Sequence, residues 1–385
     1  MLKDGFRTWR CCSGRRDDQV KFRVNRDVLA DAVAWVARVL PNRPAIPVLS
    51  GLLLEADGDD LVLSVFDYDV SARVSIEAVV AEPGRALIPG RILAEITRSL
   101  PGDVVEVATS GSEAVLTCGS AEFGLLTMPV EDFPSLPEMP PKIGAVGGGI
   151  FATAVGQVAS AASRDETLPM LTGIRFDISG DDVTLAATDR YRIAAREFGW
   201  RPERPGTAAA AMVPARVLVE VARSLRGGEV SVALGEGIAG FESVGRATTV
   251  RLLDEQFIDY RARLTDDWSI RADLRVAPFV DAIKRVALVA ERNTPIRLSF
   301  GQGQVLIQAG GGDIGRGTEV VDAELSGDDI QIAFQSHFLL DGLNGVETEF
   351  VRLNMESPSR PALITEVPGD ADPAFRYLVM SLRLT

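Results

Sequence analysis

The chain has 385 residues, 46% of them apolar and 6% aromatic, so it can bury several cores and is not expected to be largely disordered. Three cysteines and one histidine exclude a Cys/His zinc site and a disulfide framework. The formal net charge of −14 argues against binding to nucleic acid unless positive charge gathers on one face. Without a run of roughly 20 apolar residues or a signal peptide, we expect a cytoplasmic protein with no membrane contact.

One amphipathic helix is written three times along the chain. Residues 1–19 lack any periodic pattern and are predicted to form a flexible tail. The repeated helix then follows as LADAVAWVARVL (29–40), FATAVGQVASAA (151–162) and FVDAIKRVALVA (279–290). Small or branched apolar residues recur at matching positions, and the first two copies keep a constant offset of 122 residues. Such a stripe predicts a helix with one buried face.

A predicted hairpin repeats at the same offset. GLLLEADGDDLVLSVFDYD begins at Gly51 and GIRFDISGDDVTLAATDRY begins at Gly173. Both alternate apolar and polar residues around a Gly-Asp-Asp turn, which indicates two antiparallel strands. No gap is needed across this stretch, so internal duplication explains the match better than chance does.

A second helix also recurs, as IPGRILAEITRSL (88–100), VPARVLVEVARSL (213–225) and FQSHFLLDGLNGV (334–346). Each unit therefore contains a helix, a hairpin with further strands, a second helix and more strands. We predict an α+β fold of three tandem repeats, with antiparallel sheets carrying two helices on one face. Pro-rich and polar stretches place the domains at residues 20–140, 141–266 and 267–385.

Several motifs resemble catalytic ones and are interpreted otherwise. The GxGxxG matches at 235–240 and 310–315 are followed by strand-like runs, so hairpin turns are favoured over a dinucleotide site. The chain has no GxxxxGK[ST] sequence, and His337 lacks a nearby nucleophile or carboxylate constellation. We expect no catalysis, no cofactor and no metal. The alternative, a three-domain enzyme, would require an ionisable cluster that the sequence does not reveal.

The predicted helices carry a charge opposite to that of the whole chain. With their immediate flanks they hold thirteen basic and nine acidic residues, so acidic residues concentrate on strands and turns. If the helices face inward in a ring, the hole is mildly positive and can hold duplex DNA through phosphate contacts that do not depend on sequence. The alternative is that these arginines are scattered on solvated helix faces.

From about Lys21 to the C-terminus the chain resembles the bacterial DNA sliding clamp, the beta subunit of DNA polymerase III. The resemblance is carried by five strings, NRPAIPVLSGLLLE (42–55), LLTMPVEDFPSLP (125–137), LPMLTGIRF (168–176), AATDRYRIA (186–194) and YLVMSLRL (377–384). It implies a non-catalytic processivity factor for DNA replication. It further implies a head-to-tail homodimer that closes a six-domain ring around DNA, with edge strands of the first and third domains paired between subunits.

The resemblance also implies two sets of site residues. The residues expected to face DNA are Arg43, Arg91 and Arg216. A hydrophobic groove between the second and third domains is expected to bind short peptides of the polymerase III alpha subunit, the clamp loader and repair proteins. Its expected residues are Leu171, Thr188, Arg190, Tyr191, Arg192, Ile193, Ile258, Arg263, Leu378, Val379, Met380, Ser381, Leu382 and Arg383.

Three expected groove residues depart from the family pattern. Ile258 stands where proline is usual, Arg263 where an apolar residue is usual, and Ser381 where a second proline is usual. These changes are compatible with a divergent clamp that tolerates a clamp-directed antibiotic, or with drift in a housekeeping clamp. A further alternative is a partner scaffold of the same fold that no longer encircles DNA.

Overall fold

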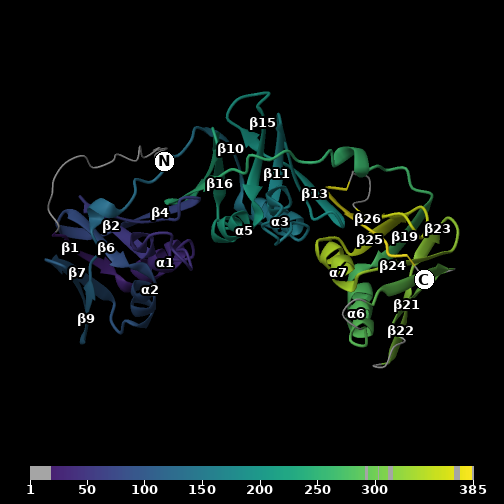
Figure 1. Ribbon diagram of the computed structural model, residues 1–385, viewed down its shortest axis with the longest axis horizontal. Helices are drawn as coiled ribbons and strands as arrows, with labels where there is room; N and C mark the ends of the chain where they lie inside the picture. Colours follow the sequence, from purple (N-terminus) through teal and green to yellow (C-terminus); the bar gives the residue numbers. More distant parts are fainter. Residues whose placement is uncertain (1–18, 291–293, 302, 311–314, 368–372, 384–385) are drawn as a thin grey trace. The chain divides into compact units, whose positions relative to one another are not determined.

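A computed structural model describes residues 19–290, 294–301, 303–310, 315–367 and 373–383, and the predicted tail at 1–19 lies outside them except for Gln19. The chain forms two compact units, shown in Figure 1. One runs to Pro137 and includes Gly245–Ala247, and the other comprises Glu138–Val244 and Thr248–Thr385. Within the described part of the chain, no helix has the length and apolar character needed to cross a membrane.

The first unit contains one repeat with two antiparallel sheets, ordered β5-β1-β7-β8-β9 and β6-β2-β3-β4. Its elements are β1 (Lys21–Asn25), α1 (Arg26–Val36), η1 (Pro47–Ser50), β2 (Gly51–Asp57), β3 (Asp60–Phe66), β4 (Val70–Glu77), β5 (Val79–Glu82), β6 (Gly84–Pro89), α2 (Gly90–Ser99), β7 (Val104–Ser110), β8 (Glu113–Cys118), β9 (Ala121–Leu126) and η2 (Val130–Asp132).

The second unit begins with a repeat of the same order, except that the first two residues of its last strand, β18, belong to the first unit. Its elements are β10 (Lys142–Gly147), α3 (Gly148–Ala159), α4 (Pro169–Thr172), β11 (Gly173–Ser179), β12 (Asp182–Thr188), β13 (Arg192–Gly199), β14 (Arg201–Pro202), β15 (Ala208–Pro214), α5 (Ala215–Ser224), β16 (Glu229–Gly235), β17 (Ile238–Ser243) and β18 (Arg246–Arg251). We call this repeat the middle domain and the repeat in the first unit the N-terminal domain.

The second unit ends with a third repeat, which we call the C-terminal domain. Its elements are η3 (Arg261–Arg263), β19 (Ile270–Arg275), α6 (Val276–Ala287), β20 (Ile296–Gly301), β21 (Gln304–Gly310), β22 (Arg316–Asp322), β23 (Glu324–Ser326), β24 (Ile330–Phe334), α7 (Ser336–Asn344), β25 (Phe350–Met355), β26 (Ala362–Glu366) and β27 (Phe375–Val379). One sheet spans both repeats of this unit in the order β15-β11-β12-β13-β27-β26-β25-β19-β23.

The repeated helices lie where the sequence predicts them, but their starts differ. α1, α3 and α6 begin at Arg26, Gly148 and Val276, three residues before each predicted segment, and end about three residues earlier. In α1 the cause is the side chain of Asn25, which accepts hydrogen bonds from the N–H groups of Asp27 and Val28 and so fixes the first turn. In each repeat the two long helices pack side by side (Figure 1).

The predicted hairpins are confirmed. Asp57 pairs with Asp60 and Ser179 pairs with Asp182, and Gly58 and Gly180 occupy the two turns with φ of 60°. The first GxGxxG match forms the turn between β16 and β17, as predicted. The second match, 310–315, lies mostly outside the described residues.

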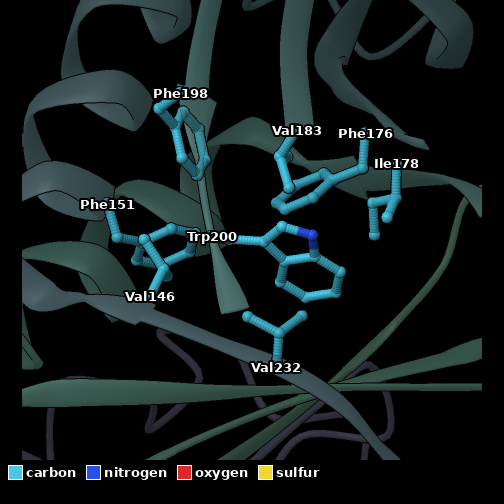
Figure 2. A pocket seen from close by; sticks show the side chains of 8 residues that line it. All are labelled: Val146, Phe151, Phe176, Ile178, Val183, Phe198, Trp200 and Val232. Carbon is cyan, nitrogen blue, oxygen red and sulfur yellow. The ribbon is translucent and has the colours of Figure 1, made fainter. Parts of the chain in front are cut away.

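The core of the middle domain is shown in Figure 2. Trp200 lies among apolar side chains from both sheets and from α3, and its indole N–H donates to the carbonyl of Gly180 at 2.9 Å. The residues around the small hollow here are Val146, Phe151, Phe176, Ile178, Val183, Phe198, Trp200 and Val232. Because none of them offers a charged anchor for a ligand, we interpret this hollow as core packing.

Helix α7 needs a glycine where it approaches the sheet. A Cβ atom on Gly342 would lie 2.5 Å from Cδ1 of the fully buried Tyr377. Gly342→Ala is therefore expected to lower the free energy of unfolding by about 1–3 kcal/mol, although alanine favours helix formation by about 1 kcal/mol. Urea unfolding measures this change. Gly149→Ala in α3 is the control, because a Cβ there meets no atom within 4 Å, and a loss of stability as large as that of Gly342→Ala would contradict the explanation.

Candidate functional site

The joint between the middle and C-terminal domains is a pair of antiparallel strands. Ile193 of β13 lies opposite Leu378 of β27, and Arg192 lies opposite Val379. Beyond β27, the N–H of Met380 donates to the carbonyl of Tyr191 at 2.9 Å, and that of Leu382 donates to Ala333 at 2.8 Å. These bonds bring residues 378–382 beside the turn at 188–192.

That turn is fixed by its own side chains. The hydroxyl of Thr188 donates to the carbonyl of Arg192 at 2.7 Å and accepts from the N–H of Arg190 at 3.2 Å. Asp189 Oδ1 accepts from the N–H groups of Tyr191 and Arg192. Arg190 has a φ of 78°, a left-handed conformation that non-glycine residues rarely adopt. The turn therefore presents Tyr191 to solvent in a defined position.

Arg192 joins the two domains through its guanidinium group. Nε lies 2.9 Å from Asp189 Oδ2, while Nη1 lies 2.5 Å from Asp341 Oδ2 and 3.1 Å from Tyr377 Oη. Its Cζ atom lies 4.5 Å from the ring centre of Phe338, on which Tyr191 also stacks. Burial by itself lowers the pKa of Arg192, but Tyr377 and the carboxylate of Asp341 raise it above its ordinary value. Like any arginine, Arg192 stays protonated, so its charge is a fixed feature of the joint.

An apolar cluster forms next to this joint. Its buried members come from β12, β13, the linker after β18, β26 and β27, and they are Ala186, Ile193, Ala195, Tyr260, Leu264, Leu363 and Leu378. Phe257, Ile258 and Trp268 pack against it and stay half-buried. We call this cluster, with the exposed side chains of Tyr191 and Met380, the junction surface.

The linker is anchored by Tyr260, whose hydroxyl donates to Asp177 Oδ2 at 2.9 Å. Burial raises the pKa of this hydroxyl, and the hydrogen bond to Asp177 raises it further. Arg263 lies in the short helix η3 with its side chain exposed, one residue before the buried Leu264. The charge at position 263 is therefore solvated and does not lie within the apolar cluster.

The other expected groove residues differ in how much of each is exposed to solvent. Leu171 and Val379 are buried, Leu382 is half-buried and Arg383 is exposed. Ser381 is half-buried, and its Oγ has no hydrogen-bond partner among the described residues. Sequence reasoning missed Phe338 and Asp341, which complete the contacts of Arg192. They lie on α7 about 150 residues from Arg192, and no local motif marks them.

The three arginines expected to face DNA all have exposed side chains. Arg91, in the first turn of α2, donates from Nη2 to the carbonyls of Leu40 and Pro41 and to Asn42 Oδ1, at 3.3, 3.1 and 2.7 Å. Arg43 follows in the same loop, so the two cations lie on neighbouring segments of the N-terminal domain. Arg216 occupies the equivalent first turn of α5 in the middle domain.

No group of three or more histidine, cysteine or acidic side chains in the described ranges could hold a metal ion. The joint instead combines a few partly exposed apolar side chains with a rigid turn, which is suited to binding a partner's side chains.

Three family models match the chain in succession. They are the N-terminal domain of the DNA polymerase III beta subunit at residues 20–137, its central domain at 146–259 and its C-terminal domain at 266–383.

Whole proteins match over nearly the full chain. The chain is 52% identical over 375 residues to the beta sliding clamp of Streptomyces coelicolor, and the match covers 95% of this chain and 100% of that protein. It is 42% identical over 370 residues to the beta sliding clamp homolog GriR of Streptomyces muensis, covering 94% and 99%. The crystal structure of the Pseudomonas aeruginosa sliding clamp bound to griselimycin matches with a TM-score of 0.88 and 27% identity, covering 95% and 100%. The chain therefore belongs to the DNA polymerase III beta subunit family, the bacterial sliding clamps.

Proposed function

We propose that this sliding clamp acts in DNA replication as a ring-shaped homodimer that encircles duplex DNA and tethers its partners through the junction surface. The observation that carries the proposal is the joint between β13 and β27, because it shows how one clamp domain attaches to the next. The three domains are taken as residues 20–140, 141–266 and 267–385. They are supported by the repeated order of elements, and three of them per chain give six per dimer.

The same joint can be formed between two subunits. By position in the repeat, β9 is the N-terminal counterpart of β27, and β22 is the C-terminal counterpart of β13. Each is the last strand of its sheet in the described structure, so each offers an unpaired edge. Pairing β9 of one subunit with β22 of the other in both directions closes a head-to-tail dimer.

Exposed leucines support this assignment of the subunit interface. Leu288, directly after α6, is 82% exposed, and Leu126, at the end of β9, is 74% exposed. α6 packs against β22, so Leu288 directly follows the helix that lies next to one open edge. Burial of both side chains in a dimer would remove apolar area from water.

DNA binding is assigned to the helices, with Arg43, Arg91 and Arg216 contacting phosphates. The support is their exposure and the equivalent positions of Arg91 and Arg216 at the starts of α2 and α5. Phosphate contacts carry no sequence information, as a protein that slides requires. Few such contacts are needed if the ring itself retains the DNA.

The junction surface is assigned to apolar peptides of the polymerase III alpha subunit, the clamp loader and repair proteins. Tyr191, Ile258 and Met380 provide partly exposed apolar area beside a rigid turn, which lowers the entropic cost of binding. Arg263 is placed at the rim, where its solvated charge can meet an acidic residue of a peptide. The protein is proposed to be non-catalytic, to need no cofactor and to act in the cytoplasm.

Two alternatives are less well supported. A scaffold that has lost ring closure has no need of two unpaired strand edges, which β9 and β22 keep in the described structure. A variant that tolerates a clamp-directed antibiotic rests on Ile258, Arg263 and Ser381, and the exposed position of Arg263 weakens its contribution. Both alternatives would keep the fold, so measurements of dimerisation, of retention on DNA and of ligand binding separate them from the proposed function.

Met380→Glu is expected to weaken binding of a peptide with leucine and phenylalanine side chains at least ~50-fold, because a carboxylate would be buried without a partner. Fluorescence polarisation with a labelled heptapeptide measures the affinity. Val104→Glu, at an exposed apolar position on β7, is the control and is expected to leave the affinity unchanged. Equal binding by the wild type and Met380→Glu would remove the junction surface from the proposal.

A further inference from the structure

The N-terminal domain contains the same backbone frame that supplies the middle domain's part of the junction surface. η1 and α4 both begin at a proline, Pro47 and Pro169, 122 residues apart. Ser50 Oγ donates to the carbonyl of Pro47 at 2.7 Å, and Thr172 Oγ1 donates to that of Pro169 at 2.8 Å. The strands that follow, β2 to β4 and β11 to β13, start at the same offset of 122.

The turn and the linker repeat as well. Tyr68 and Arg190, again 122 residues apart, both have positive φ, of 41° and 78°. The segments that follow β9 and β18 begin with the same hydrogen bond. The N–H of Met128 donates to the carbonyl of Leu87 at 2.8 Å, and that of Leu253 donates to the carbonyl of Met212 at 2.9 Å. Further along, FPSL at 133–136 aligns with FIDY at 257–260. Backbone geometry thus gives both domains the same frame.

The two frames differ in what fills them. Thr188, whose hydroxyl makes two hydrogen bonds within the turn, corresponds to Phe66 in the N-terminal domain. Phe66 is 6% exposed and belongs to an apolar cluster with Leu49 and Phe133. The ring of Tyr68 packs edge-on against that of Phe66, with 5.5 Å between the two ring centres. Phe133 is 7% exposed, whereas its counterpart Phe257 stays half-buried. Partly buried apolar side chains surround both clusters, and Thr188 is itself 1% exposed, so the two frames differ chiefly in the bulk of the rings of Phe66 and Phe133.

We propose that the N-terminal domain holds a closed copy of the peptide site, and that the residue at position 66 or 188 decides whether a clamp domain offers such a site. Phe66 and Phe133 occupy the space that a partner's apolar side chains would need. A small residue in place of Phe66 would open a second site for peptides with leucine and phenylalanine anchors. This inference rests on the proposed peptide binding by the junction surface.

The test counts binding sites on the full-length protein by calorimetric titration with the heptapeptide. The wild type is expected to bind one peptide per chain, and Phe66→Thr is expected to bind two. Phe66→Leu is the matched control, because leucine keeps the space filled, and it is expected to bind one. In Phe66→Thr combined with Met380→Glu, one site should remain. A Phe66→Thr protein that melts cooperatively and still binds one peptide would overturn the inference.

The reverse substitution decides the matter if Phe66→Thr does not fold. Thr188→Phe is expected to abolish the single peptide site of the wild type, while Thr188→Ser keeps it. Retained binding by folded Thr188→Phe would contradict the role given to this position. A wild type that binds no peptide would instead refute the proposed function of the junction surface, so the two failures are distinguishable.

Discussion

Arg192→Met is expected to lower the free energy of unfolding of the second unit by about 3 kcal/mol. The substitution leaves the carboxylates of Asp189 and Asp341 without their shared cation, and breaking a buried ion pair in this way typically costs about 3–5 kcal/mol. We expect the lower end of that range because the side chain of Asp341 is 40% exposed, although that of Arg192 is only 9% exposed. Urea unfolding followed by tryptophan fluorescence measures the change.

Arg223→Met provides the matched control for this prediction. Arg223 also pairs with a carboxylate, that of Glu220 at 3.2 Å, but both side chains are largely exposed. Exposed pairs of this kind contribute about 0.5 kcal/mol or less. If Arg192→Met and Arg223→Met lowered stability equally, Arg192 would not be the brace between the middle and C-terminal domains that its contacts indicate.

Leu288→Asp is expected to convert the proposed dimer into monomers, raising the dimer dissociation constant at least ~100-fold. A carboxylate in place of Leu288 would be buried at the subunit interface without a partner, and a 100-fold change corresponds to about 2.7 kcal/mol. Sedimentation velocity over a range of concentrations measures the dissociation constant. The fold should not change, since Leu288 is 82% exposed within the chain.

Val79→Asp is the control for the dimer prediction. Val79 is 71% exposed on β5, at the opposite edge of the sheet that ends in β9. Its replacement should leave the dissociation constant unchanged, because this edge is not assigned to the interface. A Leu288→Asp protein that stays dimeric at nanomolar concentration would show that the subunits meet elsewhere.

The repeated order of elements could be predicted from the sequence because its signals are local. Alternation around the Gly-Asp-Asp turns is enough to identify a hairpin, and an apolar stripe is enough to identify a helix. The apolar stripe predicts each of these helix starts three residues late, because the stripe begins after the first turn. In α1 that turn is set by the polar cap Asn25.

The site was less accessible to sequence reasoning because its contacts join distant segments. The resemblance indicates Arg192 as part of the partner groove. Its guanidinium group, however, is already engaged by Asp189, Asp341 and Tyr377, and only the folded chain reveals this. Similarly, the sequence shows that Arg263 is charged, whereas the fold shows that this charge is solvated. The resemblance indicates the positions of these residues, and the packing of the folded chain determines what their side chains contact.

Retention on circular DNA is the most direct test of enclosure by a ring. The clamp is loaded onto a nicked circular duplex with its clamp loader and then washed at about 1 M salt, where phosphate contacts are strongly screened. The proposed ring predicts that the protein stays on the circle through the wash and is released when one cut makes the DNA linear. Equal loss from circular and linear DNA in the wash, or retention after the cut, would contradict it.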